Sequence, residues 1–143
     1  MIKKVYRFIK YNDHKKLWIQ AYYYTAIFSF MRVAIPAKYF RRTWGEEFKE
    51  SSFEESEENI RFAKEVGYVV GMVSKRTKWQ SACLIRALSA QRMIAKKNIK
   101  TTMYIGFTKT KDGDQAHAWL RCGNAYITGG TGDGFIVLTK FLR

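Results

Sequence analysis

The chain has 143 residues, a length that suits one domain and leaves no room for two independent cores. Hydrophobic residues make up 47% and charged residues 27% of it, a composition that excludes intrinsic disorder. Its two cysteines, Cys83 and Cys122, exclude a disulfide framework and a four-cysteine zinc site. No secretory signal is evident, so we expect an intracellular, cytoplasmic protein.

The net charge of +14 is unevenly distributed along the chain. Residues 1–45 and 66–143 are strongly basic, and residues 46–65 between them are acidic. The charge alone permits nucleic-acid binding, but no zinc-finger, homeodomain or RRM signature accompanies it, so we expect no nucleic-acid partner. A solvated basic surface and attraction to an acidic peptide or to anionic lipid are the other interpretations of this charge.

The first predicted element is a helix from Lys15 to Ile35, ending before Pro36. Its centre, Leu17 to Met31, holds fifteen residues without a charge, fewer than the roughly 20 needed to span a bilayer. We therefore expect a buried or half-buried helix. Contact with a membrane surface is the alternative, because lysines and aromatic residues flank the segment.

A glutamate-rich segment follows and introduces the second predicted helix. Ser51 and Ser52 stand three residues before Glu54 and Glu55, the spacing of a capping box, which predicts a helix that begins near residue 53. Helical periodicity predicts its end between Ser74 and Lys78. The glutamates are expected in the turn and the first helical turns, where the helix dipole favours acids, rather than in a metal site.

The last part of the chain predicts one more helix and then short strands. The helix spans about 81–97, with Asn98 as its C-cap. Alternating β-formers predict strands after it, at residues 101–108, 116–121, 125–128 and 135–138, separated by loops at 109–115, 123–124 and 129–134. We therefore expect residues 1–143 to form one α+β domain, helical over 1–78, with the third helix packed on an antiparallel sheet over 79–143.

Two residues in this layout suggest nucleophilic chemistry. Cys83 lies in the first turn of the third helix, where unpaired N–H groups and the dipole favour a thiolate and can face an oxyanion. His117 lies on a strand that can reach this helix start once the sheet packs against it. A cysteine followed by a histidine in this arrangement is the core of papain-like and transglutaminase-like chemistry. Buried structural roles for both residues are the alternative, and Gln80 is either an oxyanion donor or a polar residue at the helix entry.

Several short strings resemble one enzyme family, the lasso-peptide leader peptidases. Residues 79–88 (WQSACLIRAL) resemble their Cys-Leu-x-Arg-Ala-Leu motif, and residues 116–120 (AHAWL) are similar to their Ala-His-Ala-Trp-Val/Leu strand. Residues 104–107 (YIGF) resemble the Ile-Gly strand between those motifs, and residues 135–138 (FIVL) resemble the C-terminal segment. The resemblance extends over about residues 17–142.

The resemblance implies a small transglutaminase-like cysteine protease with Cys83 as nucleophile, His117 as base and no cofactor. It implies a ribosomally made precursor peptide as substrate, with leader removal before macrolactam closure by an asparagine-synthetase-like cyclase. It also implies a separate leader-recognition protein, so we expect the discrete, stand-alone form of the peptidase. The alternatives are a transglutaminase-like acyltransferase that uses an amine, and a non-catalytic basic module that binds nucleic acid or a membrane surface.

The chain departs from the family at the third member of the triad. The family completes Cys-His-Asp with an aspartate on the strand after the histidine strand. The residues expected to return beside His117 are Thr128, Gly129 and Gly130, and none of them is a carboxylate. Asp133, the nearest downstream acid, is the predicted third member. A dyad oriented by a backbone group or by Thr128 is the alternative.

Overall fold

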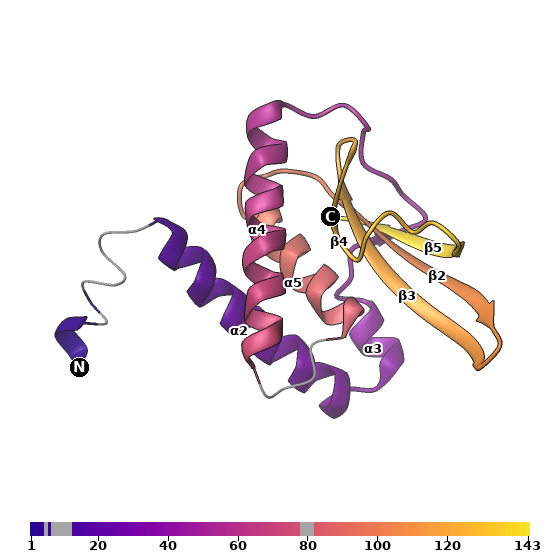
Figure 1. Ribbon diagram of the computed structural model, residues 1–143, viewed down its shortest axis with the longest axis horizontal. Helices are drawn as coiled ribbons and strands as arrows, with labels where there is room; N and C mark the ends of the chain where they lie inside the picture. Colours follow the sequence, from indigo (N-terminus) through magenta and orange to yellow (C-terminus); the bar gives the residue numbers. More distant parts are fainter. Residues whose placement is uncertain (5, 7–12, 78–81) are drawn as a thin grey trace.

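A computed structural model describes residues 1–4, 6, 13–77 and 82–143. The helices are α2 (Asp13–Ala34), α3 (Ala37–Arg41), α4 (Glu57–Arg76) and α5 (Cys83–Ala95). The strands are β1 (Glu46–Glu47), β2 (Thr102–Thr110), β3 (Gly113–Cys122), β4 (Ala125–Thr128) and β5 (Ile136–Leu142). Figure 1 shows the helices gathered on one side and the sheet on the other, with α5 between α4 and the strands. The predicted α+β fold is confirmed.

The described strands form one antiparallel sheet in the order β1-β5-β2-β3-β4. The turn between β2 and β3 is confined to Lys111 and Asp112, so both strands are longer than the alternation of β-formers predicted. The final strand is also longer than predicted, and it pairs with β2 on the side away from β3. Gly106 of β2 thus has His117 of β3 opposite it on one side and Val137 of β5 on the other.

The apolar core lies where α2, α4 and α5 meet one face of the sheet. Along β3, Ala118, Leu120 and Cys122 belong to this core. Because side chains alternate along a strand, His117 and Trp119 lie on the other face of β3, where their rings stack on each other. The two faces of β3 therefore have different roles, one for packing on the helices and one that carries the histidine.

The predicted first helix is confirmed as α2, which packs on both α4 and α5. Leu17, Ala21 and Phe28 face the core, while Phe30 and Val33 are 69% and 87% exposed. None of the helices in the described ranges combines the length and the apolar character needed to cross a membrane.

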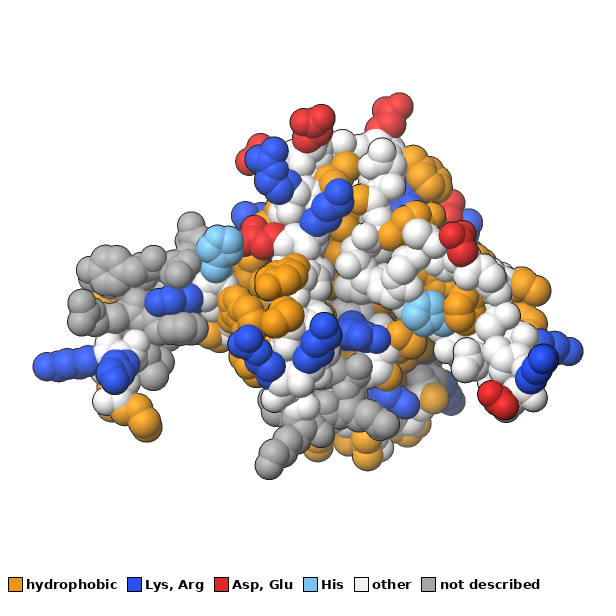
Figure 2. All heavy atoms as spheres, in the orientation of Figure 1, with side chains coloured by type: hydrophobic (Ala, Val, Ile, Leu, Met, Phe, Trp, Pro, Cys, Tyr) orange, Lys and Arg blue, Asp and Glu red, His pale blue; other side chains and the backbone are white. Residues whose placement is uncertain are grey.

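The predicted start of the second helix is wrong. Helix α4 begins at Glu57, and Ser56 is its N-cap, with Oγ accepting from the Asn59 N–H at 3.2 Å. Ser51 is instead buried against the sheet, where its N–H donates to the Thr102 hydroxyl at 2.8 Å. The first of the two serines thus forms a long-range contact that capping-box spacing does not reveal. Figure 2 shows a group of acidic side chains at the end of the molecule where α4 begins.

Candidate active site

Cys83 is the first residue of α5 and is half-buried at the edge of the core. The preceding N-cap residue, Ala82, provides no side-chain hydrogen bond to the first turn. The unpaired amide groups in the first turn of a helix can face a thiolate or an oxyanion. Gln80, considered above as an oxyanion donor, lies outside the described residues.

His117 is held by a backbone carbonyl. Its Nε2 lies 2.5 Å from the carbonyl oxygen of Gly129. A carbonyl can only accept, so Nε2 carries the proton and Nδ1 is left with a free lone pair. The ring also stacks on Trp119 and contacts Phe135, with centroid separations of 5.8 and 4.9 Å. These contacts fix both the tautomer and the plane of the imidazole, with Nδ1 as the basic nitrogen.

The carbonyl reaches His117 because residue 129 has no side chain. Gly129 has a φ of +77°, and a Cβ there would lie 2.4 Å from the Ala118 carbonyl oxygen. Gly132 likewise has a φ of +76°, and a Cβ there would lie 2.4 Å from the Trp119 indole. The loop after β4 therefore lies directly against β3, and position 129 cannot hold an aspartate without displacing that strand.

The structure does not place Asp133 against His117. Asp133 is exposed, and the contact found for it within the described residues is its backbone N–H to the Thr131 hydroxyl at 3.4 Å. The nitrogen that a triad aspartate would bind is taken by Gly129. A backbone orienting group was the alternative to Asp133 in the sequence analysis, and this is the arrangement observed.

Cys83 and His117 come from packed elements, α5 and β3, but no hydrogen bond joins them in the described part of the chain. Cys83 packs on the core side of β3, whereas the ring of His117 lies on the side with Trp119. Among the described residues, no three histidine, cysteine or carboxylate side chains gather closely enough to hold a metal ion.

Beside the histidine lies a polar network that the sequence analysis missed. Arg121 is 1% exposed, and its Nε donates to the Tyr104 hydroxyl at 2.9 Å. That hydroxyl donates to Glu50 at 2.7 Å, and this bond, together with nearby Lys140, lowers the pKa of the Glu50 carboxyl. Burial, reinforced by the same bond, raises the pKa of Tyr104. Because Tyr104 stacks on Trp119 at 5.5 Å, the network supports the aromatic surface on which His117 rests.

Comparison with known families agrees with this architecture. The family model of the transglutaminase-like superfamily matches residues 30–140, which include Cys83, His117 and Asp133. The chain therefore belongs to the transglutaminase-like superfamily, whose chemistry uses a cysteine and a histidine. No curated protein and no solved structure matches the chain.

The two thiols are expected to differ sharply in reactivity. Cys122 is fully buried, and desolvation raises its pKa to about 11, so roughly one molecule in 10⁴ carries its thiolate at pH 7. Cys83 is only half-buried and lies at the start of α5, so the reagent can reach its sulfur more readily. A short pulse of limiting iodoacetamide, followed by peptide mass spectrometry, should label Cys83 at least about 100-fold faster. Unfolding in urea is the control and should equalise the two rates; preferential labelling of Cys122 in the folded protein would contradict the prediction.

Proposed function

We propose that this protein is a cytoplasmic cysteine peptidase that removes the leader from a ribosomally made lasso precursor peptide before macrolactam closure. The observation that carries the proposal is a cysteine at the start of α5, followed by a tautomer-fixed histidine on β3, within a chain of the transglutaminase-like superfamily. The resemblance of residues 79–88 and 116–120 to the motifs of leader peptidases supports the substrate class.

In the proposed reaction, the Cys83 thiolate attacks the scissile carbonyl and forms a thioester as the peptide C–N bond breaks. His117 Nδ1 accepts the thiol proton and passes it to the leaving amine, while Nε2–H keeps its bond to Gly129. Water then hydrolyses the thioester, delivers the leader with a free carboxylate, and returns the thiol proton to Cys83. The freed amine belongs to the core peptide, which a macrolactam cyclase would use next.

The proposal requires the imidazole to reach the Cys83 sulfur when substrate binds. Catalytic hydrogen bonds are often long or misaligned in unliganded enzymes and tighten only in the substrate complex. A direct test compares the pH profile of Cys83 alkylation in the wild type and in His117→Ala, with substrate-derived peptide present and absent. A paired thiol should react faster near pH 6 to 7 only when His117 is present, whereas identical profiles under both conditions would exclude the pair.

The function itself is tested by cleavage of a lasso precursor peptide. We expect slow cleavage of the precursor alone and at least about tenfold faster cleavage when the separate leader-recognition protein is added, because delivery raises the effective substrate concentration at the site. Time courses by mass spectrometry at substrate well below saturation measure both rates. Equal rates would reject delivery, and no cleavage under either condition would reject the peptidase.

The same assay separates hydrolysis from acyl transfer to an amine. A peptidase releases a leader with a free C-terminal carboxylate, because the acyl group of the thioester takes the hydroxyl of water and Cys83 takes the remaining hydrogen. An acyltransferase would instead yield a leader amide when a primary amine such as cadaverine is present. We expect the carboxylate product at all amine concentrations that leave the protein folded, and a dominant amide product would favour the acyltransferase.

A further inference from the structure

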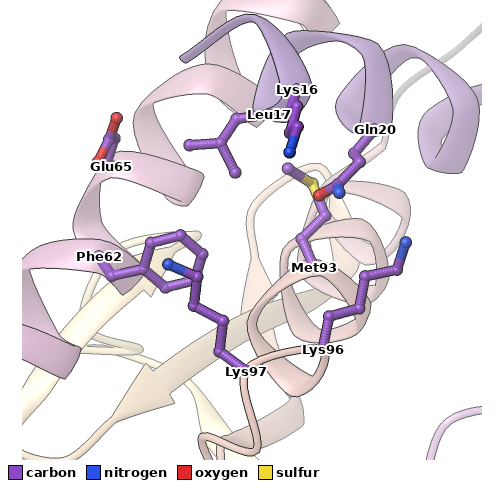
Figure 3. A pocket seen from close by; sticks show the side chains of 8 residues that line it. All are labelled: Lys16, Leu17, Gln20, Phe62, Glu65, Met93, Lys96 and Lys97. Carbon is purple, nitrogen blue, oxygen red and sulfur yellow. The ribbon is translucent and has the colours of Figure 1, made fainter. Parts of the chain in front are cut away.

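A cavity of about 340 Å³ opens where α2, α4 and α5 meet. Figure 3 shows its apolar floor, formed by Leu17 of α2, Phe62 of α4 and Met93 of α5. Leu17 and Met93 are 8% and 1% exposed, so the floor is continuous with the core. The cavity therefore offers an apolar base that is fixed by the packing of three helices.

Lysines dominate the rim of this cavity. Lys16 comes from α2, and Lys96 and Lys97 follow the last turn of α5. None of the three has a carboxylate within ion-pair distance among the described residues, and the one acid at the rim, Glu65, is already paired with His14. Three cations and one acid line the cavity, so its net charge is positive.

Local structure explains only part of this arrangement. The C-terminal carbonyls of α5 favour cations, and Lys97 and Lys96 lie over the rings of Phe62 and Tyr24, at 4.1 and 5.2 Å. A cation over a ring still presents N–H donors on its other side. Lys16 belongs to another helix and gains nothing from the end of α5. The three lysines therefore line one cavity, and no carboxylate of the described residues lies within ion-pair distance of them.

We propose that this lysine-rimmed cavity is a docking site for an acidic peptide segment in which carboxylates flank an apolar side chain. The apolar side chain would rest on Leu17, Phe62 and Met93, and the carboxylates would accept hydrogen bonds from the lysines and from the Gln20 amide. Such a segment can cover the apolar floor and also pair with the lysines of the rim, whereas a small inorganic anion would leave the floor uncovered. The chemistry of the cavity thus selects a peptide of mixed acidic and apolar character.

The site is separate from the candidate active site. Cys83 begins α5 and the two lysines follow its end, so the 13 residues of the helix, about 20 Å, lie between them. Binding here would hold a peptide partner without contact to the reacting thiol. The inference therefore does not depend on the reaction proposed at Cys83, and a Cys83→Ala variant should bind the acidic peptide as the wild type does.

The test uses fluorescence polarisation with the full chain. The probe is a labelled peptide that alternates Glu with Leu or Phe, and its counterpart carries Gln in place of every Glu. The wild type should bind the glutamate peptide at least about tenfold more tightly, and added salt should weaken that binding. The triple variant Lys16→Gln, Lys96→Gln, Lys97→Gln should lose about tenfold in affinity.

A charge-matched control separates this cavity from the general basic surface. Lys75, Lys109 and Lys111 are exposed elsewhere, and changing all three to glutamine should alter affinity by less than about twofold. Equal losses in the two triple variants, or equal binding of the two peptides, would overturn the proposal. In another outcome, the protein would co-sediment with phosphatidylglycerol vesicles in a way that depends on Lys16, Lys96 and Lys97, and would fail to bind the glutamate peptide. That result would assign the cavity to lipid and would also overturn the proposal.

Discussion

Replacing Cys83 or His117 with alanine is expected to abolish leader cleavage while the fold stays intact. Loss of the thiol removes the group that forms the thioester, and loss of the imidazole removes the group that accepts and returns the proton. Because the members of a catalytic unit act together, each single variant and the double variant should lose about 10⁴-fold or more in rate. The rate is measured by mass spectrometry of the precursor peptide with the leader-recognition protein present.

The chain supplies its own matched controls, because it has a second cysteine and a second histidine. Cys122→Ala and His14→Ala should retain cleavage within about tenfold of the wild type, since Cys122 lies in the core and His14 is paired with Glu65 at the surface. Thermal melts confirm that each variant is folded. A folded Cys83→Ala or His117→Ala protein with more than about a tenth of wild-type activity would refute the assignment.

Local periodicity was sufficient to predict most of the helices and strands. The uncharged stretch before Pro36 identified α2, and helical spacing identified α5, each to within a few residues. Alternation of β-formers identified β2 and β4. The short elements α3 and β1 carry too few residues for a period, and they were missed. The position of β5 beside β2 depends on a long-range pairing, such as that of Ile105 with Thr139, which no local pattern encodes.

The candidate site was predictable only where side chains define it. Cys83 and His117 are identified by residue type and order, but the group that orients His117 is a backbone carbonyl. Only the left-handed conformation of Gly129, and the absence of its Cβ, bring that carbonyl to the ring. The sequence therefore favoured Asp133, the nearest acid downstream of the histidine strand, whose side chain is exposed at the surface.

Arg121 shows why long-range burial escapes a sequence pattern. A basic residue on a strand, in a chain of net charge +14, is expected to face solvent. The segment that covers it comes from before α4, about 70 residues earlier, and presents the carbonyls of Ser51 and Ser52 to its guanidinium at 2.9 and 3.2 Å. Phe53 completes the enclosure, with its ring 3.7 Å from the guanidinium carbon. The Arg121 side chain thereby holds the segment before α4 against the sheet face that also carries His117.

Arg121→Ala should therefore be among the most destabilising single changes in the chain. It would remove the donor to the Tyr104 hydroxyl and leave buried carbonyls, including that of Gly123 at 2.6 Å, without a partner. Each buried group left without a partner costs about 1–3 kcal/mol, so the loss of several should lower the free energy of unfolding, measured by urea denaturation, by at least about 3 kcal/mol. Arg61→Ala, at an exposed position on α4, is the control and should change it by less than about 0.5 kcal/mol. A loss below about 1 kcal/mol for Arg121→Ala would show that the segment before α4 is held by other contacts.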